Sequence, residues 1–213
     1  MSISSEQMRS TKTRPYRMNR RAEQVDQTRE RITAAAVRLH TTVGPTNTSI
    51  ASVAEEAGVT RLTVYRHFAD LDALFHACRG HWLATNPPPD DSAWRSIPGL
   101  ETRARVAFSQ MYAWYGEHGQ ELYPIYRDAP SLPRGTQDAM RAESEARTDA
   151  LLDDIPLPAG SRRSVRAVAG HLLGLWTWRS LVVQQGLSRK EAVEVAVRML
   201  CATAASDSSG SRR

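Results

Sequence analysis

The ten residues VTRLTVYRHF, at positions 59–68, decide the fold of this chain. Thr60 is a typical helix cap, and Val64 and Phe68 lie four positions apart, on one face of the helix that follows. Most of the remaining positions are polar, charged or aromatic: Arg61, Thr63, Tyr65, Arg66 and His67. The stretch predicts a short helix that is held by two apolar residues and displays a basic, hydrogen-bonding surface.

The residues before this stretch predict a second short helix and a sharp turn. The helix begins near Thr48, and Gly58 ends it. Its apolar residues at helical spacing are Ile50, Val53, Ala54 and Ala57. Two short helices joined by such a turn form a helix-turn-helix, whose second helix enters the major groove of DNA. We therefore expect the 59–68 helix to contact bases, since arginine can bind guanine through two hydrogen bonds.

Two longer amphipathic helices flank this unit. From Val25 onward a helical stripe appears, with Asp26 or Thr28 as a candidate cap, and Gly44 followed by Pro45 stops it. Its apolar positions are Ile32, Ala35, Ala36, Leu39 and Val43. Asp70 caps the next helix, in which Leu71, Leu74, Phe75, Cys78 and Trp82 repeat at helical spacing.

The rest of the chain also predicts helices. Three consecutive prolines within 84–93 interrupt the pattern, and further helices are expected at 99–116, 119–128, 134–153, 161–185 and 188–205. No alternation of period two suggests a sheet. The predicted fold is all-α, about nine helices, with a three-helix helix-turn-helix domain before a larger helical body. The expected divisions are a flexible basic arm at 1–24, the helix-turn-helix domain at 25–70, the helical body at 71–205 and a flexible tail at 206–213.

Positive charge is concentrated at the N-terminus. The chain carries a formal net charge of +5, and residues 1–21 hold six basic residues against Glu6. The basic residues are Arg9, Lys12, Arg14, Arg17, Arg20 and Arg21. Such an arm either binds an anionic polymer or is a solvated tail, and charge alone does not decide between them.

No apolar run reaches the roughly 18 residues that span a membrane, and no apolar segment follows the basic start as in a secretion signal. Cys78 and Cys201 form no metal pattern. We expect a cytoplasmic protein with free thiols and no membrane association.

The segments TRERITAAAVRLHTTVG (28–44) and TSIASVAEEAGVTRLTVYRHFADLDALF (48–75) resemble the DNA-binding domain of the tetracycline-repressor (TetR) family. The resemblance implies an all-helical homodimer that binds a double-stranded DNA operator and carries a variable ligand-binding domain. By position it implies that Thr60, Arg61, Leu62, Thr63, Tyr65, Arg66 and His67 face DNA, and that Thr48 and Ser49 contact phosphate.

Two positions depart from the commonest pattern of the family. Leucine at position 62 stands where a small residue or proline is frequent, and suggests an apolar contact, such as one with a thymine methyl. Leu71 stands where a phosphate-binding lysine is frequent. The arginines of the arm, Arg14, Arg17, Arg20 and Arg21, are candidates to compensate by entering the minor groove.

An aromatic cluster is the candidate effector site. Tyr112, Trp114, Tyr115, Tyr123 and Tyr126 fall within fifteen residues, beside Pro124, which is expected to kink or break the helix. His171 and Trp176 on a later helix are further candidates. The cluster is either the lining of a pocket for a small apolar or aromatic effector or ordinary core.

Small residues near the C-terminus suggest close helix packing. Gly170 and Gly174 lie four positions apart, and the last helix repeats Ala192, Val195, Ala196, Met199 and Leu200. These two helices either form a dimer interface or pack within the chain, and we favour the interface.

The sequence holds none of the common local catalytic motifs, such as G-x-S-x-G, H-E-x-x-H or a P-loop. His76 and Cys78 point in divergent directions on a helix and cannot share a metal ion. We expect a ligand-released transcriptional repressor without catalytic activity, cofactor or metal. The alternative is a helical enzyme or lipid-binding protein with a basic arm.

Overall fold

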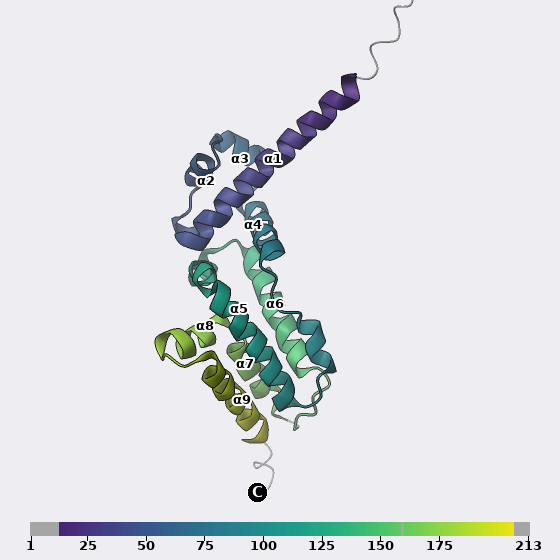
Figure 1. Cartoon of the computed structure of the whole chain (residues 1–213), viewed down its shortest axis with the longest axis vertical. Helices are drawn as coiled ribbons and strands as arrows, with labels where there is room; N and C mark the ends of the chain where they lie inside the picture. Colours follow the sequence, from purple (N-terminus) through teal and green to yellow (C-terminus); the bar gives the residue numbers. More distant parts are fainter. Residues whose placement is uncertain (1–12, 159, 207–213) are drawn as a thin grey trace, which may run out of the picture.

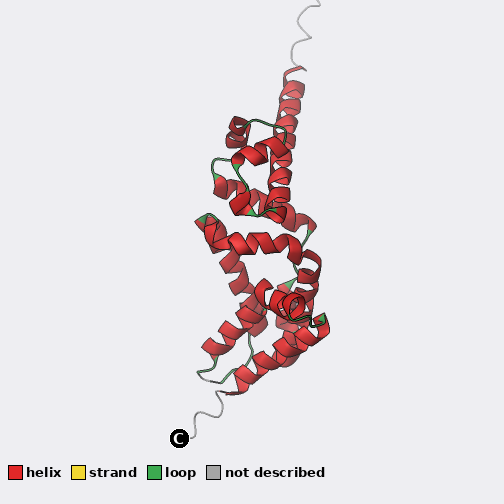
Figure 2. Cartoon of the chain, turned by 90° about the vertical axis from the view of Figure 1, so that its left-hand side faces the viewer, coloured by secondary structure: helices red, strands yellow, loops and turns green. Residues whose placement is uncertain are grey.

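The computed structural model describes residues 13–158 and 160–206, with side chains from Ala22 onward. Its described residues form helices and no strand, as Figure 2 shows. The all-α prediction is therefore confirmed. The molecule is elongated, with the helix-turn-helix at one end and the helical body at the other (Figure 1). None of the described helices has the length and apolar character needed to cross a membrane.

The N-terminal domain is built from α1 (Thr13–Thr42), a 3-10 turn η1 (Pro45–Asn47), α2 (Ile50–Glu56) and α3 (Arg61–His67). Its core is made by the predicted apolar stripes and includes Ile32, Ala35, Ala36, Val53, Val64 and Phe68. The side chain of Ser49 caps α2, and that of Thr60 caps α3 by accepting a hydrogen bond from the Thr63 backbone. Between them, Gly58 adopts a φ of 63°, a left-handed conformation that glycine takes without strain.

The first helix begins well before the predicted start. We expected residues 13–24 to belong to a flexible arm, but they form the first turns of α1, so neither Asp26 nor Thr28 caps it. Pro15 stands in its first turn, where a missing N–H costs no helical hydrogen bond. Residues 1–12 and 207–213, which include the rest of the arm and the tail, lie outside the described residues.

The body begins with α4 (Leu71–Thr85), whose start is capped by Asp70 as predicted. Its other elements are η2 (Asp91–Ser96), α5 (Leu100–Asp128), η3 (Ala129–Ser131), α6 (Arg134–Leu152), α7 (Arg162–Leu172), α8 (Leu175–Trp178), the π-helical turn η4 (Arg179–Gln184) and α9 (Arg189–Ser206). Helix α5 runs through the body and packs on α9, α1 and α6.

Two predicted helix boundaries are wrong. The break expected between the helices at 99–116 and 119–128 is absent, and Pro124 does not break the second one, because α5 runs without interruption through both. The carbonyl that the proline leaves without a helical partner belongs to Gln120, which is exposed and can be hydrated. Conversely, the single helix expected at 161–185 is interrupted at Gly174, whose backbone is extended.

Two carboxylates tie the N-terminal domain to α5 and α4 to α6. Asp128, at the end of α5, accepts hydrogen bonds from the backbone N–H and the hydroxyl of Thr46, at 3.0 and 2.6 Å. Asp72, on α4, accepts the same pair from Thr136 on α6, at 3.0 and 2.8 Å. At Gly44, where φ is 93°, a Cβ would stand 2.5 Å from the Asp128 carboxylate, so glycine is required for this approach.

Candidate nucleic-acid interface and effector cavity

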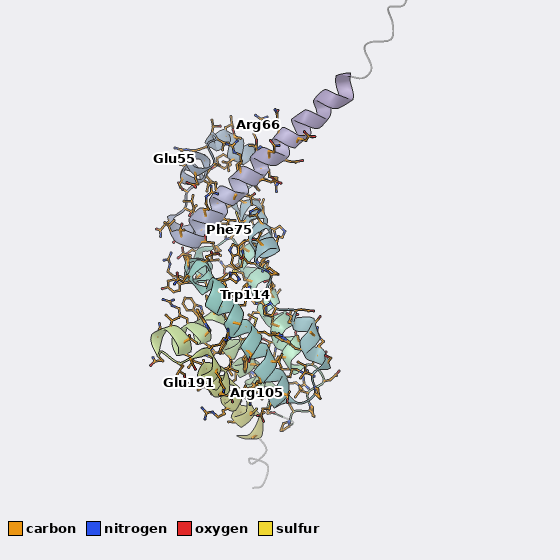
Figure 3. All side chains as sticks on the ribbon, in the orientation of Figure 1. Glu55, Arg66, Phe75, Arg105, Trp114 and Glu191 are labelled. Carbon is orange, nitrogen blue, oxygen red and sulfur yellow. The ribbon has the colours of Figure 1, made fainter. Side chains whose placement is uncertain are left out.

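Helix α3 turns most of its predicted DNA-facing side chains to the solvent. Leu62 is 69% exposed and Tyr65 58% exposed, and Arg61 and Arg66 are exposed beside them. These four positions share one helical face, and Figure 3 places Arg66 at the outer end of the N-terminal domain. The opposite face holds Val64, which is buried. Thr63 and His67 are half-buried at the edges of the exposed face, and the Thr63 hydroxyl lies 2.9 Å from that of the cap, Thr60.

Two arginines of α1 bond to backbone carbonyls of the helix-turn-helix, and sequence reasoning missed both. Arg29 donates a hydrogen bond to the carbonyl of His67, and its guanidinium lies 4.2 Å from the ring centre of Phe68. Arg31 donates to the carbonyl of Ala57 at the end of α2. Backbone carbonyls at the ends of helices lack helical partners, so these contacts satisfy them and orient both helices.

The start of α2 presents backbone and hydroxyl groups that are already bonded within the chain. Ser49 and Ser52 form a reciprocal capping box. The hydroxyl of Thr48 donates to the carbonyl of Gly44 at 2.9 Å. A phosphate contact at Thr48 or Ser49 therefore stays a prediction and would have to share these groups.

The arm residues Arg14, Arg17, Arg20 and Arg21 lie on the first turns of α1, which project beyond the rest of the N-terminal domain (Figure 1). Their side chains lie outside the described part of the structure. Their predicted contact with the minor groove remains a prediction.

A cavity of about 90 Å³ lies where the N-terminal domain meets the body. Its walls come from α1 and α4 on one side and from α5 and α6 on the other. The wall is mostly apolar and aromatic and includes His40, Phe75, Trp82, Trp114 and Tyr126. Figure 3 labels Phe75 and Trp114, which border it from α4 and α5. Such an apolar cavity with few polar groups is typical of a small-molecule site.

The predicted aromatic cluster divides between this cavity and the core. Trp114 and Tyr126 line the cavity, together with Leu122 on the same face of α5. Tyr112 and Tyr115 do not line it: they are fully or almost fully buried, and their hydroxyls donate to the carbonyls of Leu172 and Leu173. They hold the end of α7, so the core interpretation fits both.

The other predicted effector residues lie on the outside of the body. Tyr123 and Trp176 contact each other edge to face at 5.8 Å, and Trp176 is 47% exposed. His171 is exposed on α7. None of the three borders the cavity. Tyr112 and Tyr115 do not border it either. Five of the seven residues predicted to bind the effector therefore lie outside the cavity.

The charged groups around the cavity are Arg79, Glu143 and Arg147. Glu143 is in close contact with Arg79 and lies 3.9 Å from Arg147. His40 stacks on Phe75 at 4.5 Å, and burial lowers the pKa of His40 to about 4, so its ring is neutral at pH 7. Burial is also the main cause that raises the pKa of Tyr126. No cluster of potential metal ligands occurs among the described residues.

Residues 32–78 match the family model described as "Bacterial regulatory proteins, tetR family". This range contains α2, α3 and the core that supports them. The N-terminal domain belongs to the tetR family. The prediction made from its N-terminal motifs is thereby confirmed, and the chain is a DNA-binding regulator of the helix-turn-helix type.

Solved tetR-family structures share the fold beyond the matched domain. A tetR-family transcriptional regulator from Streptomyces coelicolor is 20% identical, with a TM-score of 0.55 over 84% of this chain and 80% of that chain. A TetR transcription regulator from Haloarcula marismortui is 16% identical, with a TM-score of 0.51 over 85% and 98%. The multidrug binding protein EbrR, complexed with imidazole, is 23% identical, with a TM-score of 0.50 over 80% and 93%. No curated protein sequence matches the chain.

The C-terminal helices pack first against the body of their own chain. In α9, Ala192, Ala196 and Leu200 are fully buried against neighbouring helices. Met199 is 49% exposed and Val195 is half-buried, on a face that points away from this core. Gly170 packs within the chain, because a Cβ there would lie 3.3 Å from the Thr148 hydroxyl. Intrachain packing therefore accounts for part of the predicted interface pattern, and dimerisation stays a prediction.

Proposed function

We propose that this protein is a homodimeric transcriptional repressor that leaves a palindromic operator when a small apolar or aromatic effector binds. The observation that carries the DNA-binding part is α3, which exposes Arg61, Leu62, Tyr65 and Arg66 on one face. Two such helices in a symmetric dimer would read two half-sites about one turn of DNA apart. The exposed face of α9, with Met199, is the candidate surface for the second copy. The proposed place of action is the cytoplasm.

The position of the cavity supports effector control. At about 90 Å³ it is smaller than the roughly 150 Å³ cavity that holds benzene in other proteins, so an aromatic effector must push its walls apart. The walls on one side, α1 and α4, share a core with the helix-turn-helix, whereas those on the other, α5 and α6, belong to the rest of the body. Effector binding would therefore favour an arrangement in which the two domains are displaced, and shift the population away from the DNA-binding one.

The hydrogen bonds of Asp128 connect the cavity walls to the segment that precedes α2, and those of Asp72 connect α4 to α6, so that a displacement of the walls would be transmitted to α2 and α3. Asp128 follows Tyr126, a cavity residue, and holds Thr46 directly before α2. Asp72 belongs to α4, which also provides Phe75, and holds Thr136 at the start of α6. A movement of either wall would thus act on the orientation of the helix-turn-helix. The imidazole bound to the multidrug binding protein EbrR supports small-molecule binding by this fold.

The test begins with a gel-shift assay on the DNA upstream of the coding region, followed by a screen for compounds that release it. A helical enzyme or lipid-binding protein, the alternative, would show no specific shift. Tyr126→Ala should leave operator binding within a few-fold of wild type and weaken release by the compound, because Tyr126 lines the cavity. Tyr123→Ala, on the same helix but outside the cavity, is the matched control and should keep normal release. Equal release from both variants would remove the cavity from the mechanism.

A further inference from the structure

One polar group in the cavity wall has no partner. Trp114 is 8% exposed, and its indole Nε1 is the buried side-chain donor for which the described residues provide no acceptor. The neighbouring Trp82 differs, because its indole N–H donates to Glu121 at 2.7 Å. A buried donor without an acceptor destabilises a protein, so its presence in a cavity wall indicates an acceptor supplied by a ligand.

The ionised groups of the cavity leave one positive charge uncompensated. Arg79 and Arg147 share a single carboxylate oxygen, Oε2 of Glu143. Arg79 is in close contact with that oxygen, whereas the Nη2 of Arg147 lies 3.9 Å from it. The side chain of Arg147 is also the less accessible, 14% exposed against 30% for Arg79.

The groups around this trio do not neutralise the charge. His40 is uncharged at pH 7 because burial holds its pKa at about 4. The carboxylates of Asp70 and Asp72 border a separate outer groove, which Arg79 reaches and Arg147 does not. Arg147 therefore lines the cavity as a largely covered cation, with one long ion pair and a hydrogen bond with the hydroxyl of Tyr126, which carries no charge to balance it. A charge of that kind favours an anionic partner.

We propose that the effector is a small aromatic carboxylate, or a monoanion of the same shape and charge. Its carboxylate would accept hydrogen bonds from Trp114 Nε1 and from the guanidinium of Arg147, and its ring would lie among Phe75, Trp82 and Tyr126. A neutral analogue would satisfy Trp114 but leave the charge of Arg147 unpaired. This inference rests on the proposed function, since it names the chemistry of the effector that enters the same cavity.

The test uses the full-length protein with two probes of matched shape, benzoate and the neutral benzamide. The chain contains five tryptophans, so the indole N–H signal of Trp114 is assigned in a ¹⁵N spectrum through the Trp114→Phe variant. Benzoate should shift this signal and bind about ten-fold or more tightly than benzamide, as expected for a charge-assisted hydrogen bond. Arg147→Gln should abolish this preference, and Arg147→Lys should retain most of it. Arg141→Gln, on the same helix with a side chain 66% exposed, is the control and should behave like wild type.

The two probes distinguish a wrong charge of the effector from a wrong position of the effector site. Equal affinity for benzoate and benzamide, with the Trp114 signal shifted by both, would overturn the anionic effector and leave the cavity as the effector site. The absence of a shift with either probe would overturn both the anionic effector and the cavity as the effector site. If Arg147→Gln does not fold, the affinities of wild type and of Arg147→Lys for benzoate and benzamide still decide whether the effector is anionic. Operator binding measured without a probe is independent of these outcomes and tests the DNA-binding part separately.

Discussion

A single residue of α1, Arg29, fixes the C-terminal end of the DNA-facing helix α3. Its guanidinium bonds the carbonyl of His67 and stacks over Phe68, so it holds the end of α3 without belonging to its exposed face. Arg29→Ala should lower the free energy of unfolding by about 1–2 kcal/mol, from one hydrogen bond and one cation–π contact. It should weaken binding to cognate and random DNA together. Denaturant unfolding and paired DNA titrations measure both effects.

Arg66→Ala provides the contrast for that prediction. Arg66 is exposed and belongs to the face that meets DNA, so its loss should reduce the preference for the cognate site with little change in stability. If Arg29→Ala instead keeps wild-type stability and loses preference at a single base pair, Arg29 is itself a base-reading residue.

At the scale of elements, the junction between α5 and η1 depends on the ionised form of Asp128. The hydrogen bond from Arg127 is the main cause that lowers the pKa of Asp128 below its ordinary value, and the two bonds from Thr46 add to it against burial. The folded carboxylate therefore stays ionised where the unfolded chain takes up a proton, near pH 3.9. Its stabilising contribution is complete above that pH and is lost as the pH falls through the range between the two pKa values.

Asp128→Asn should lower the free energy of unfolding by about 1–3 kcal/mol at pH 7, because a buried charged hydrogen bond is lost. The difference from wild type should narrow as the pH is lowered from 5 to 3. Asp138→Asn, whose side chain is 61% exposed on α6, is the control and should differ little from wild type at either pH. A difference that stays constant over this range would mean that the charge of Asp128 does not hold the junction.

The first turns of α1 hold basic residues that we expect to contact phosphate. Deleting residues 1–21 removes six basic residues and the first turns of α1. Binding should weaken on all DNA sequences, and its salt dependence should flatten by close to one unit of slope for each lost phosphate contact. Fluorescence anisotropy titrations across a salt series measure this slope. An unchanged slope would show that the arm makes no phosphate contact.

At the scale of the whole molecule, the sequence predicts those elements whose signals are local. Gly58, the cap at Thr60 and the stripe around Val64 specify the helix-turn-helix within a few residues, and the structure agrees. The first turns of α1 were missed because residues 13–24 show no apolar period, and those with described side chains, 22–24, are exposed. Their helix depends on intrinsic propensity.

The cavity was only partly predictable, because it joins four helices that are distant in sequence. On α5, Trp114, Leu122 and Tyr126 line the cavity, whereas Tyr112 and Tyr115 are buried and bonded to the end of α7. Helical spacing alone could not have separated lining from core, because Tyr115 lies seven positions before Leu122 and therefore shares its face of the helix. No local pattern indicates that Phe75 and Arg147 approach Trp114, since tertiary packing alone brings them together.

Whether α3 reads a specific operator can be measured by selecting bound sequences from random DNA with wild type and with Arg66→Ala. Wild type should enrich a palindrome whose two half-sites lie about one helical turn apart. The variant should enrich the same palindrome with relaxed preference at one position in each half-site, at a cost of about 1–3 kcal/mol on the wild-type sequence. The absence of any enriched sequence, or an identical motif from both proteins at equal affinity, would contradict this account of α3.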